Sequence, residues 1–371
     1  MDPAPKPDTE DEVEKIIERV RDVHHRLGAA EPDDPFSEEQ PWPEPVVGAT
    51  LLDDVADTFC RHLSLKEGVA DTLTLWAVST HAIEVSEFAP RLYLTSPTAG
   101  CGKSLTLAIL TRLCRRPLPD SNITTAAIFR AVHHTQATLL IDEIDTFLKH
   151  HRESIGILNS GHYRPMAYVR RLMRGVVVSF STFGAVALAG IGSLKVAALE
   201  SRCIILPMRK RGPDEEIEAL RVHRGRDRVL RDLGRKAARW TIDHLDRLGE
   251  AEPEMPDQLS DRGQDNWRVM IAIADLAGGE WPRRARDAAV NLSAPSEALS
   301  TPELLLADIR DIFDRSMSTR IKTSVLVQTL TEMEDREWGS LTQWSVAVML
   351  KPFGIRPVVK KLRGESVASR L

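Results

Sequence analysis

The sequence of 371 residues predicts an α/β protein whose strands form a parallel β-sheet. Three observations support this class. Short apolar runs recur between stretches of helical periodicity, the first run leads into a glycine-containing turn, and the second ends in a pair of carboxylates. Strands that alternate with helices are typical of a parallel sheet covered on both faces. We expect the strands at 91–95, 137–141, 175–180, 185–189 and 203–207.

The remaining elements are expected to be helical until the end of the chain. Apolar periodicity predicts an amphipathic helix within 10–27, core helices at 51–63, 70–81 and 103–114, helical structure throughout 214–292, and tail helices at 302–315, 322–335 and 342–352. Residues 354–365 indicate a strand, a turn and a return strand, which with the three tail helices predict a winged helix. The expected domains are an acidic leader and linker (1–45), a core (46–212), a helical lid (213–297) and the winged helix (298–371).

Charge is distributed unevenly along the chain. The total is 54 acidic against 49 basic side chains, but residues 1–45 hold 14 acids and five bases, which leaves a mildly basic body. A strongly basic DNA-coating protein is therefore excluded, whereas a body that binds nucleic acid is not. The four cysteines lack zinc or disulfide spacing, no apolar run approaches the roughly 20 residues of a membrane span, and no signal peptide begins the sequence. These features predict a cytoplasmic protein without a membrane partner.

The strongest motif is a phosphate-binding loop between the first expected strand and the next helix. Its glycines let backbone N–H groups surround phosphate oxygens, its lysine neutralises them, and its serine hydroxyl binds Mg²⁺. The first position is proline where the common pattern has glycine. The expected nucleotide-binding residues are Pro97, Thr98, Ala99, Gly100, Cys101, Gly102, Lys103, Ser104 and Leu105.

A second motif completes a nucleotide-hydrolysing site. Leu139–Ile141 run directly into Asp142 and Glu143, at the end of a strand where α/β sheets bind ligands. Asp142 is expected to hold Mg²⁺ together with Ser104, and Glu143 to activate the attacking water. Asp145 fits either a supporting role or a helix cap. ATP and Mg²⁺ are thus the expected cofactors, with Lys103 and Glu143 catalytic.

A stretch between Glu153 and Glu200 contains no acidic residue. Its basic part also holds tyrosines, which favours a hairpin or loop that contacts single-stranded nucleic acid through phosphate pairing and base stacking. The alternative is a chain that simply crosses a buried sheet. Expected DNA-contacting residues are His162, Arg164, Arg170, Arg171 and Arg174 here, and Lys360, Lys361 and Arg363 in the basic tail, where a protein-docking winged helix is the alternative.

Three further arginines are candidate nucleotide contacts. Arg202 precedes the last core strand, the place at which ring ATPases of the AAA+ class carry an arginine that reaches the neighbour's γ-phosphate. A structural salt bridge with Glu200 is the alternative. Arg262 and Arg268 lie in the start of a lid helix and are candidate sensors of bound nucleotide, or members of a capped surface helix.

These residues resemble an actinobacterial family of P-loop proteins of unknown function, over about 51–358. The resemblance rests on Leu75–His81, Pro90–Pro97, Ile141–Glu143, Ile157–His162, Asp261–Arg262, Asn266–Trp267, Ile273–Pro282 and Pro352–Ile355. It implies a AAA+-like ATPase of a phage, prophage or plasmid, found beside primase modules. We expect a DNA-dependent ATPase, a hexameric helicase or replication protein that acts on single-stranded or forked DNA. A helicase loader or protein remodeller, and an ATP-gated DNA-binding regulator, stay open. The polar sensor is absent from Ala187–Gly192; Ser181, Thr182 and Ser193 are candidates.

Overall fold

The computed structural model describes residues 39–356 except 122, 145–146, 148–151, 174, 195, 213, 221–226, 294–300, 317–319 and 334–335. The expected leader helix within 10–27 and all but the first three residues of the strand–turn–strand expected at 354–365 lie outside these residues. In the part of the chain that is described, no helix is long and apolar enough to span a membrane.

A five-stranded parallel sheet forms the centre of the molecule, which confirms the α/β class. Its strands are β1 (Arg91–Ser96), β2 (Pro117–Asp120), β3 (Thr138–Ile141), β6 (Val186–Ile191) and β7 (Cys203–Pro207), in the spatial order β2-β3-β6-β1-β7. The strand that continues into the phosphate loop, β1, therefore lies between β6 and β7. The Asp-Glu strand, β3, is one strand further away, next to β6.

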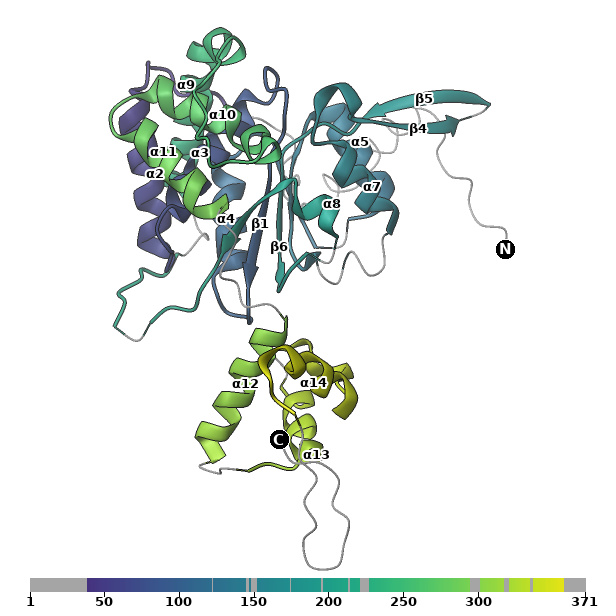
Figure 1. Ribbon diagram of the computed structural model, residues 1–371. Helices are drawn as coiled ribbons and strands as arrows, with labels where there is room; N and C mark the ends of the chain where they lie inside the picture. The colour runs from purple at the N-terminus through teal and green to yellow at the C-terminus, as the bar shows by residue number, and fades with distance from the viewer. Residues whose placement is uncertain are drawn as a thin grey trace, which may run out of the picture.

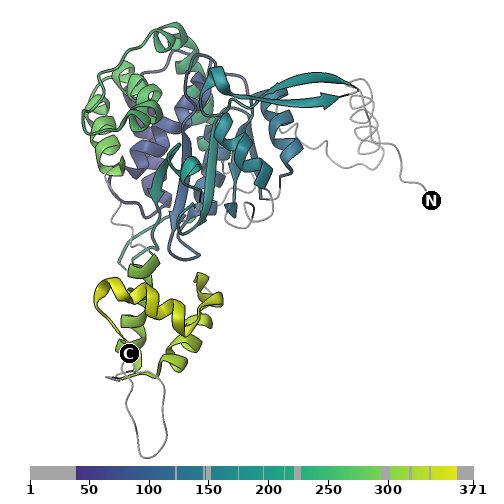
Figure 2. The ribbon, with the colours of Figure 1, turned by 45° about the vertical axis from the view of Figure 1, so that its right-hand side comes forward.

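Two expectations about the strands were wrong. The edge strand β2 was not predicted, and the run at 175–180 does not join the parallel sheet. It is β5 (Val176–Ser181), which pairs antiparallel with β4 (Tyr168–Met173) in a separate two-stranded hairpin. This hairpin extends away from the body in both views (Figures 1 and 2).

The two faces of β1 bury their side chains in different cores, as expected for a strand covered on both sides. Leu92 and Leu94 belong to one cluster of buried residues and Tyr93 to another. The first core includes helices α2 (Gly48–His62), α3 (Val69–Ser79), α4 (Lys103–Leu113), α9 (Arg228–Gly249), α10 (Asp261–Ala277) and α11 (Trp281–Ser293). The second includes α5 (Thr125–Thr135), α7 (Arg152–Ser160) and α8 (Ala197–Glu200).

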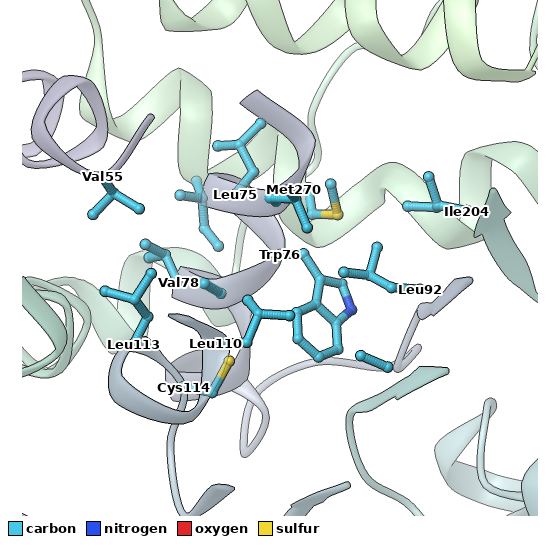
Figure 3. Packing of buried hydrophobic residues seen from close by; sticks show 14 of the residues in the cluster. Val55, Leu75, Trp76, Val78, Leu92, Leu110, Leu113, Cys114, Ile204 and Met270 are labelled. Atoms are coloured by element: carbon cyan, nitrogen blue, oxygen red, sulfur yellow. The ribbon is translucent and has the colours of Figure 1, made fainter. Parts of the chain in front are cut away.

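Trp76 of α3 anchors the first core. Its ring is fully buried, its indole N–H donates to the Pro90 carbonyl at 2.9 Å, and it faces Leu92 and Leu110 (Figure 3). The same cluster contains residues of α9, α10 and α11. The helices expected as a lid within 213–297 thus pack on the sheet-covering layer rather than apart from it. Short 3₁₀ turns complete the body at η1 (Thr80–Ala82) and η2 (Arg164–Met166).

The C-terminal helices have a core of their own. They are α12 (Thr301–Ser316), α13 (Thr323–Thr331) and α14 (Gln343–Leu350), with η3 (Glu337–Ser340) and η4 (Lys351–Phe353), and Leu305, Leu326 and Trp338 are buried among them. Figures 1 and 2 both place this unit beyond the end to which the strand arrows of the sheet point. The three tail helices agree with the expected ones in position. The domain boundaries themselves remain predictions.

Candidate nucleotide site

The loop between β1 and α4 has the backbone geometry of a phosphate cradle. Gly100 and Gly102 have φ angles of 75° and 84°. These lie in the left-handed region, which residues with a side chain adopt only with strain. A Cβ at Gly102 would also lie 2.9 Å from the Leu63 side chain. The α4 helix begins directly after this glycine, so its positive N-terminal end and free N–H groups lie at the loop.

The loop lysine is held by a serine that ends β1. The Lys103 ammonium donates to Ser96 Oγ at 2.5 Å, and Ser96 donates in turn to the Thr98 carbonyl at 2.7 Å. Ser96 is buried, whereas Ala99 and Gly100 are exposed. The hydroxyl is a neutral acceptor and the described contacts give this ammonium no carboxylate partner, so it is available to an anion in the loop.

The two motifs meet at one hydrogen bond. Ser104, in the first turn of α4, donates from Oγ to Asp142 Oδ2 at 2.6 Å, although 38 residues separate them. Because β1 and β3 run parallel, their carboxyl ends lie at the same edge of the sheet. A serine hydroxyl and a carboxylate oxygen side by side are hard oxygen donors of the kind that Mg²⁺ prefers, so these two residues fit a magnesium site completed by phosphate oxygens and water.

Glu143 carries backbone strain at this site. Its φ is 53°, in the left-handed region that non-glycine residues rarely adopt, and its N–H donates to Asp142 Oδ1 at 2.9 Å. Its side chain is exposed. Strain of this kind costs on the order of 1–3 kcal/mol and clusters at functional sites, where it holds a side chain in a required direction. The geometry is therefore consistent with a carboxylate directed out of the sheet edge.

A cavity of about 460 Å³ adjoins the loop. Leu63, which lies against Gly102, is one of its lining residues. The others come from the end of α2, its connection to α3 and the start of α3 (60–71), and from 209–217. Arg209 and Glu215 form an ion pair on its wall, and Ser64 donates to Glu215 at 2.6 Å. Hydrogen bonds from Arg209, Ser64 and Gly212 hold the pKa of Glu215 at about 2. Sequence reasoning did not identify this cavity, because its walls come from distant segments.

A second group of basic residues lies at the opposite edge of the sheet. Arg91 opens β1, is fully buried, and donates to the backbone carbonyls of Leu158 and Gly184. The Arg91 N–H also pairs with the Arg202 carbonyl, which brings Arg202 to the same edge. Burial, and then the charge of Arg262, lower the pKa of the Arg202 guanidinium. Arg202 and Arg262 are thus neighbours, at the far end of β1 from the phosphate loop.

This placement argues against Arg262 as a sensor of the nucleotide bound in the same chain. Six strand residues at about 3.3 Å each separate the two edges of the sheet along β1. Arg262 contacts His162 and Asp265, each at 3.4 Å, while Arg268 pairs with Glu252 at 2.8 Å. Arg262 lies in the first turn of α10, as the pattern predicted, whereas Arg268 lies near the middle of that helix. The helix begins at the edge of the sheet away from the phosphate loop.

Two of the expected DNA contacts are structural residues instead. The His162 ring is buried, with Nε2 2.7 Å from Asn266 Oδ1, so it offers no surface to DNA. Arg164 donates to the carbonyls of Ser86 and Ile83 and lies 4.0 Å over the Phe183 ring. These contacts fasten the base of the hairpin to the body.

The hairpin strands carry the remaining described candidates. Arg170 is exposed, whereas Arg171 pairs with Glu153 and lies over Phe129 at 5.2 Å. Of the sensor candidates, Ser193 follows β6 at the edge of the phosphate loop, while Ser181 and Thr182 precede that strand. Arg174, Lys360, Lys361, Arg363 and Asp145 lie outside the described residues, so their expected roles stay predictions.

One contact at the loop has no counterpart in the sequence analysis. Arg336, which precedes η3 in the C-terminal unit, donates from Nη1 to the Pro97 carbonyl at 2.7 Å. Its residue type and surroundings match no motif. A side chain that reaches across from another unit leaves no local signal in the sequence.

Comparison with known proteins gives matches without an assigned activity. A model of the family described as "Protein of unknown function (DUF3631)" matches residues 207–369, which supports the expected resemblance for that part of the chain. An "Uncharacterized 28.9 kDa protein in xis 5'region" of Saccharopolyspora erythraea is 36% identical over 157 residues, 40% of this chain and 58% of the relative. The chain thus spans little more than half the length of that protein. A solved structure, "The A form apo structure of NrS-1 C terminal region-CTR", aligns with 92% of this chain and 79% of its own at 12% identity and a TM-score of 0.35.

Proposed function

We propose that the protein is a P-loop enzyme that hydrolyses ATP. The observation that carries this proposal is the 2.6 Å hydrogen bond between Ser104 and Asp142, which joins the phosphate loop to the Asp-Glu motif at the carboxyl edge of a parallel sheet. In this proposal Ser104 and Asp142 hold Mg²⁺, which would neutralise charge on the phosphates. The ammonium of Lys103 turns from Ser96 to the phosphate oxygens.

Glu143 is the proposed general base. Its carboxylate accepts a proton from a water molecule as the water oxygen bonds to the γ-phosphorus and the bond to the bridging oxygen of ADP breaks. An aspartate–glutamate pair suits hydrolysis better than transfer to a second substrate, because a carboxylate beside the metal can orient water. The cavity beside Leu63 has a volume within the usual range for small-molecule sites and would receive the nucleoside.

We further propose that the ATPase is stimulated by single-stranded DNA bound on the β4–β5 hairpin. Tyr168, Arg170 and Leu172 alternate along the exposed face of β4, and Val177 lies opposite Leu172 on β5. An exposed aromatic ring, a guanidinium and aliphatic side chains together provide stacking and phosphate contacts for unpaired nucleotides. The hairpin extends from the body (Figure 2), and the side chains on this face are exposed.

The proposed assembly is a homo-oligomeric ring. Arg202 lies at the edge opposite to its own phosphate loop, so it would act on the nucleotide of a neighbouring subunit, as arginine fingers do. Arg262 supports this, because its positive charge acts on Arg202 and the combined charge of the two guanidiniums would attract an anion. The proposed partner of this ATPase is a primase or another replication protein.

The test is an ATPase assay with and without single-stranded DNA. Glu143→Gln is expected to bind ATP and lose turnover by two orders of magnitude or more. Arg170→Ala is expected to abolish the stimulation by DNA and leave basal turnover unchanged. Arg228→Ala, which removes another exposed arginine, at the start of α9, is the matched control.

Other outcomes separate the alternatives. Turnover retained in Glu143→Gln would refute the role of the base. Turnover that a partner protein stimulates, but DNA does not, would instead support a helicase loader or remodeller. Tight binding to one duplex sequence, with turnover independent of single strands, would support the regulator.

A further inference from the structure

Arg336 connects the C-terminal unit to the phosphate loop through one guanidinium. On one side, Nε and Nη2 donate to the two carboxylate oxygens of Asp308 on α12, each at 2.8 Å. On the other side, Nη1 donates to the carbonyl of Pro97 at 2.7 Å. Pro97 is the first residue of the loop that leads to Lys103. A single side chain therefore contacts the C-terminal core and the candidate nucleotide site at once.

Asp308 and Trp338 in the C-terminal unit fix the position of the Arg336 guanidinium. Asp308 is buried, and its Oδ2 also accepts the indole N–H of Trp338 at 2.7 Å. Trp338 is itself buried in the core of the C-terminal unit. A two-point pair between arginine and a buried carboxylate sets the orientation of the guanidinium as well as its distance. The ion pair with Asp308 therefore holds the Arg336 guanidinium in one orientation, unlike a mobile contact on the surface.

The arginine retains hydrogen-bonding capacity towards the loop. A guanidinium has five N–H donors, and the three contacts with Asp308 and Pro97 use three of them among the described residues. A backbone carbonyl is a neutral acceptor, whereas a phosphate oxygen carries charge and accepts roughly twice as strongly. An anion that enters the loop would thus compete favourably for the Nη1 side of Arg336.

We propose that Arg336 belongs to the nucleotide site, supplied by the C-terminal unit, so that nucleotide binding holds α12–α14 against the loop. The proposal rests on the proposed function, since it concerns the same phosphate loop. Its consequence is a mechanical one: the helices expected to contact DNA or a partner are held by the nucleotide. When the nucleotide leaves, one neutral hydrogen bond to Pro97 remains in place of charge-assisted bonds to phosphate.

The experiment measures binding of a fluorescent ATP analogue to the full chain. Arg336→Ala is expected to weaken binding about tenfold, the size expected for a charge-assisted hydrogen bond. Arg336→Lys keeps the charge and an ion pair with Asp308, but a single ammonium cannot also reach the loop, so a similar loss is expected. Arg356→Ala removes an exposed arginine of the same unit and is the matched control, with less than a twofold change.

Hydrogen exchange provides a second readout that a merely structural role would not affect. In the wild type, the ATP analogue is expected to slow exchange in 301–355, and in Arg336→Lys it is not, although the unliganded variant exchanges like the wild type. Wild-type affinity in both Arg336 variants, or unchanged nucleotide-dependent protection, would overturn the inference while the ATPase proposal stands. No analogue binding by the wild type would defeat the proposed function first, and this inference with it.

Discussion

Buried His162 makes the stability of the protein depend on pH in a defined direction. Burial, followed by the charge of Arg91, lowers the pKa of the ring to about 3 in the folded chain, whereas an unfolded histidine titrates near 6.5. As the pH falls through about 6.5, His162 therefore binds a proton in the unfolded chain but stays neutral in the folded chain. Stability contributed by the neutral ring is complete above that pH and is lost progressively below it.

The loss of stability depends only on the pKa of His162 in the unfolded chain, because the ring in the folded chain stays neutral down to pH 5. One pKa unit corresponds to about 1.4 kcal/mol, so titration of this single ring removes about 2 kcal/mol of stability between pH 7 and pH 5. The substitution that isolates it is His162→Gln, because a glutamine amide can still donate to Asn266 but does not titrate.

Urea unfolding at pH 7 and pH 5 measures this difference. Both proteins lose stability at pH 5 through their carboxylates, but the wild type is expected to lose about 2 kcal/mol more than His162→Gln. His134→Gln, at an exposed histidine, is the control and should follow the wild type. A gap between wild type and His162→Gln that is equal at both pH values would refute the argument, since it would mean that the buried ring accepts a proton without cost.

Two further predictions concern the backbone. Glu143→Gly is expected to be about 1 kcal/mol more stable than Glu143→Ala in urea unfolding, because glycine relieves the left-handed φ of 53°, while both variants lose ATPase turnover; equal stability would contradict the strain. Gly161→Ala is expected to lower the melting temperature sharply, because the new Cβ would lie 2.0 Å from the Thr182 carbonyl oxygen, whereas Gly156→Ala on α7, with open space around it, should be neutral or stabilising.

The central strands were predictable because they are buried on both faces and read as continuous apolar runs. The edge strand β2 was not, since Pro117–Asp120 contains two prolines, which cannot donate to a sheet and are confined to edges. The sequence correctly predicted a strand at 175–180, but it did not predict that this strand pairs with β4 rather than with the parallel sheet. Local composition favours an extended chain, but the choice between β6 and β4 as its neighbour depends on the tertiary fold.

The candidate site divides in the same way. Two short motifs, each next to the end of a strand, were sufficient to predict four site residues from the sequence: Lys103, Ser104, Asp142 and Glu143. Arg262 was misplaced because the sequence gives the helix that carries it but not the edge of the sheet on which that helix begins. Arg336 was missed for a similar reason, since its role depends on Asp308 and Pro97, which are remote in sequence.

The pairing of β1 also determines when the phosphate loop can acquire its shape during synthesis. Arg91 pairs with Val186 on one side and with Cys203 on the other, so β1 has no neighbour in the sheet until those distant segments have been made. Contacts of such long sequence separation form slowly, because a long loop must close before they contribute. The C-terminal helices, whose contacts are local, are expected to fold fast and independently. Until β7 has been synthesised, one edge of the apolar strand β1 lacks its neighbour. We expect the nascent chain to depend most on chaperones during this period.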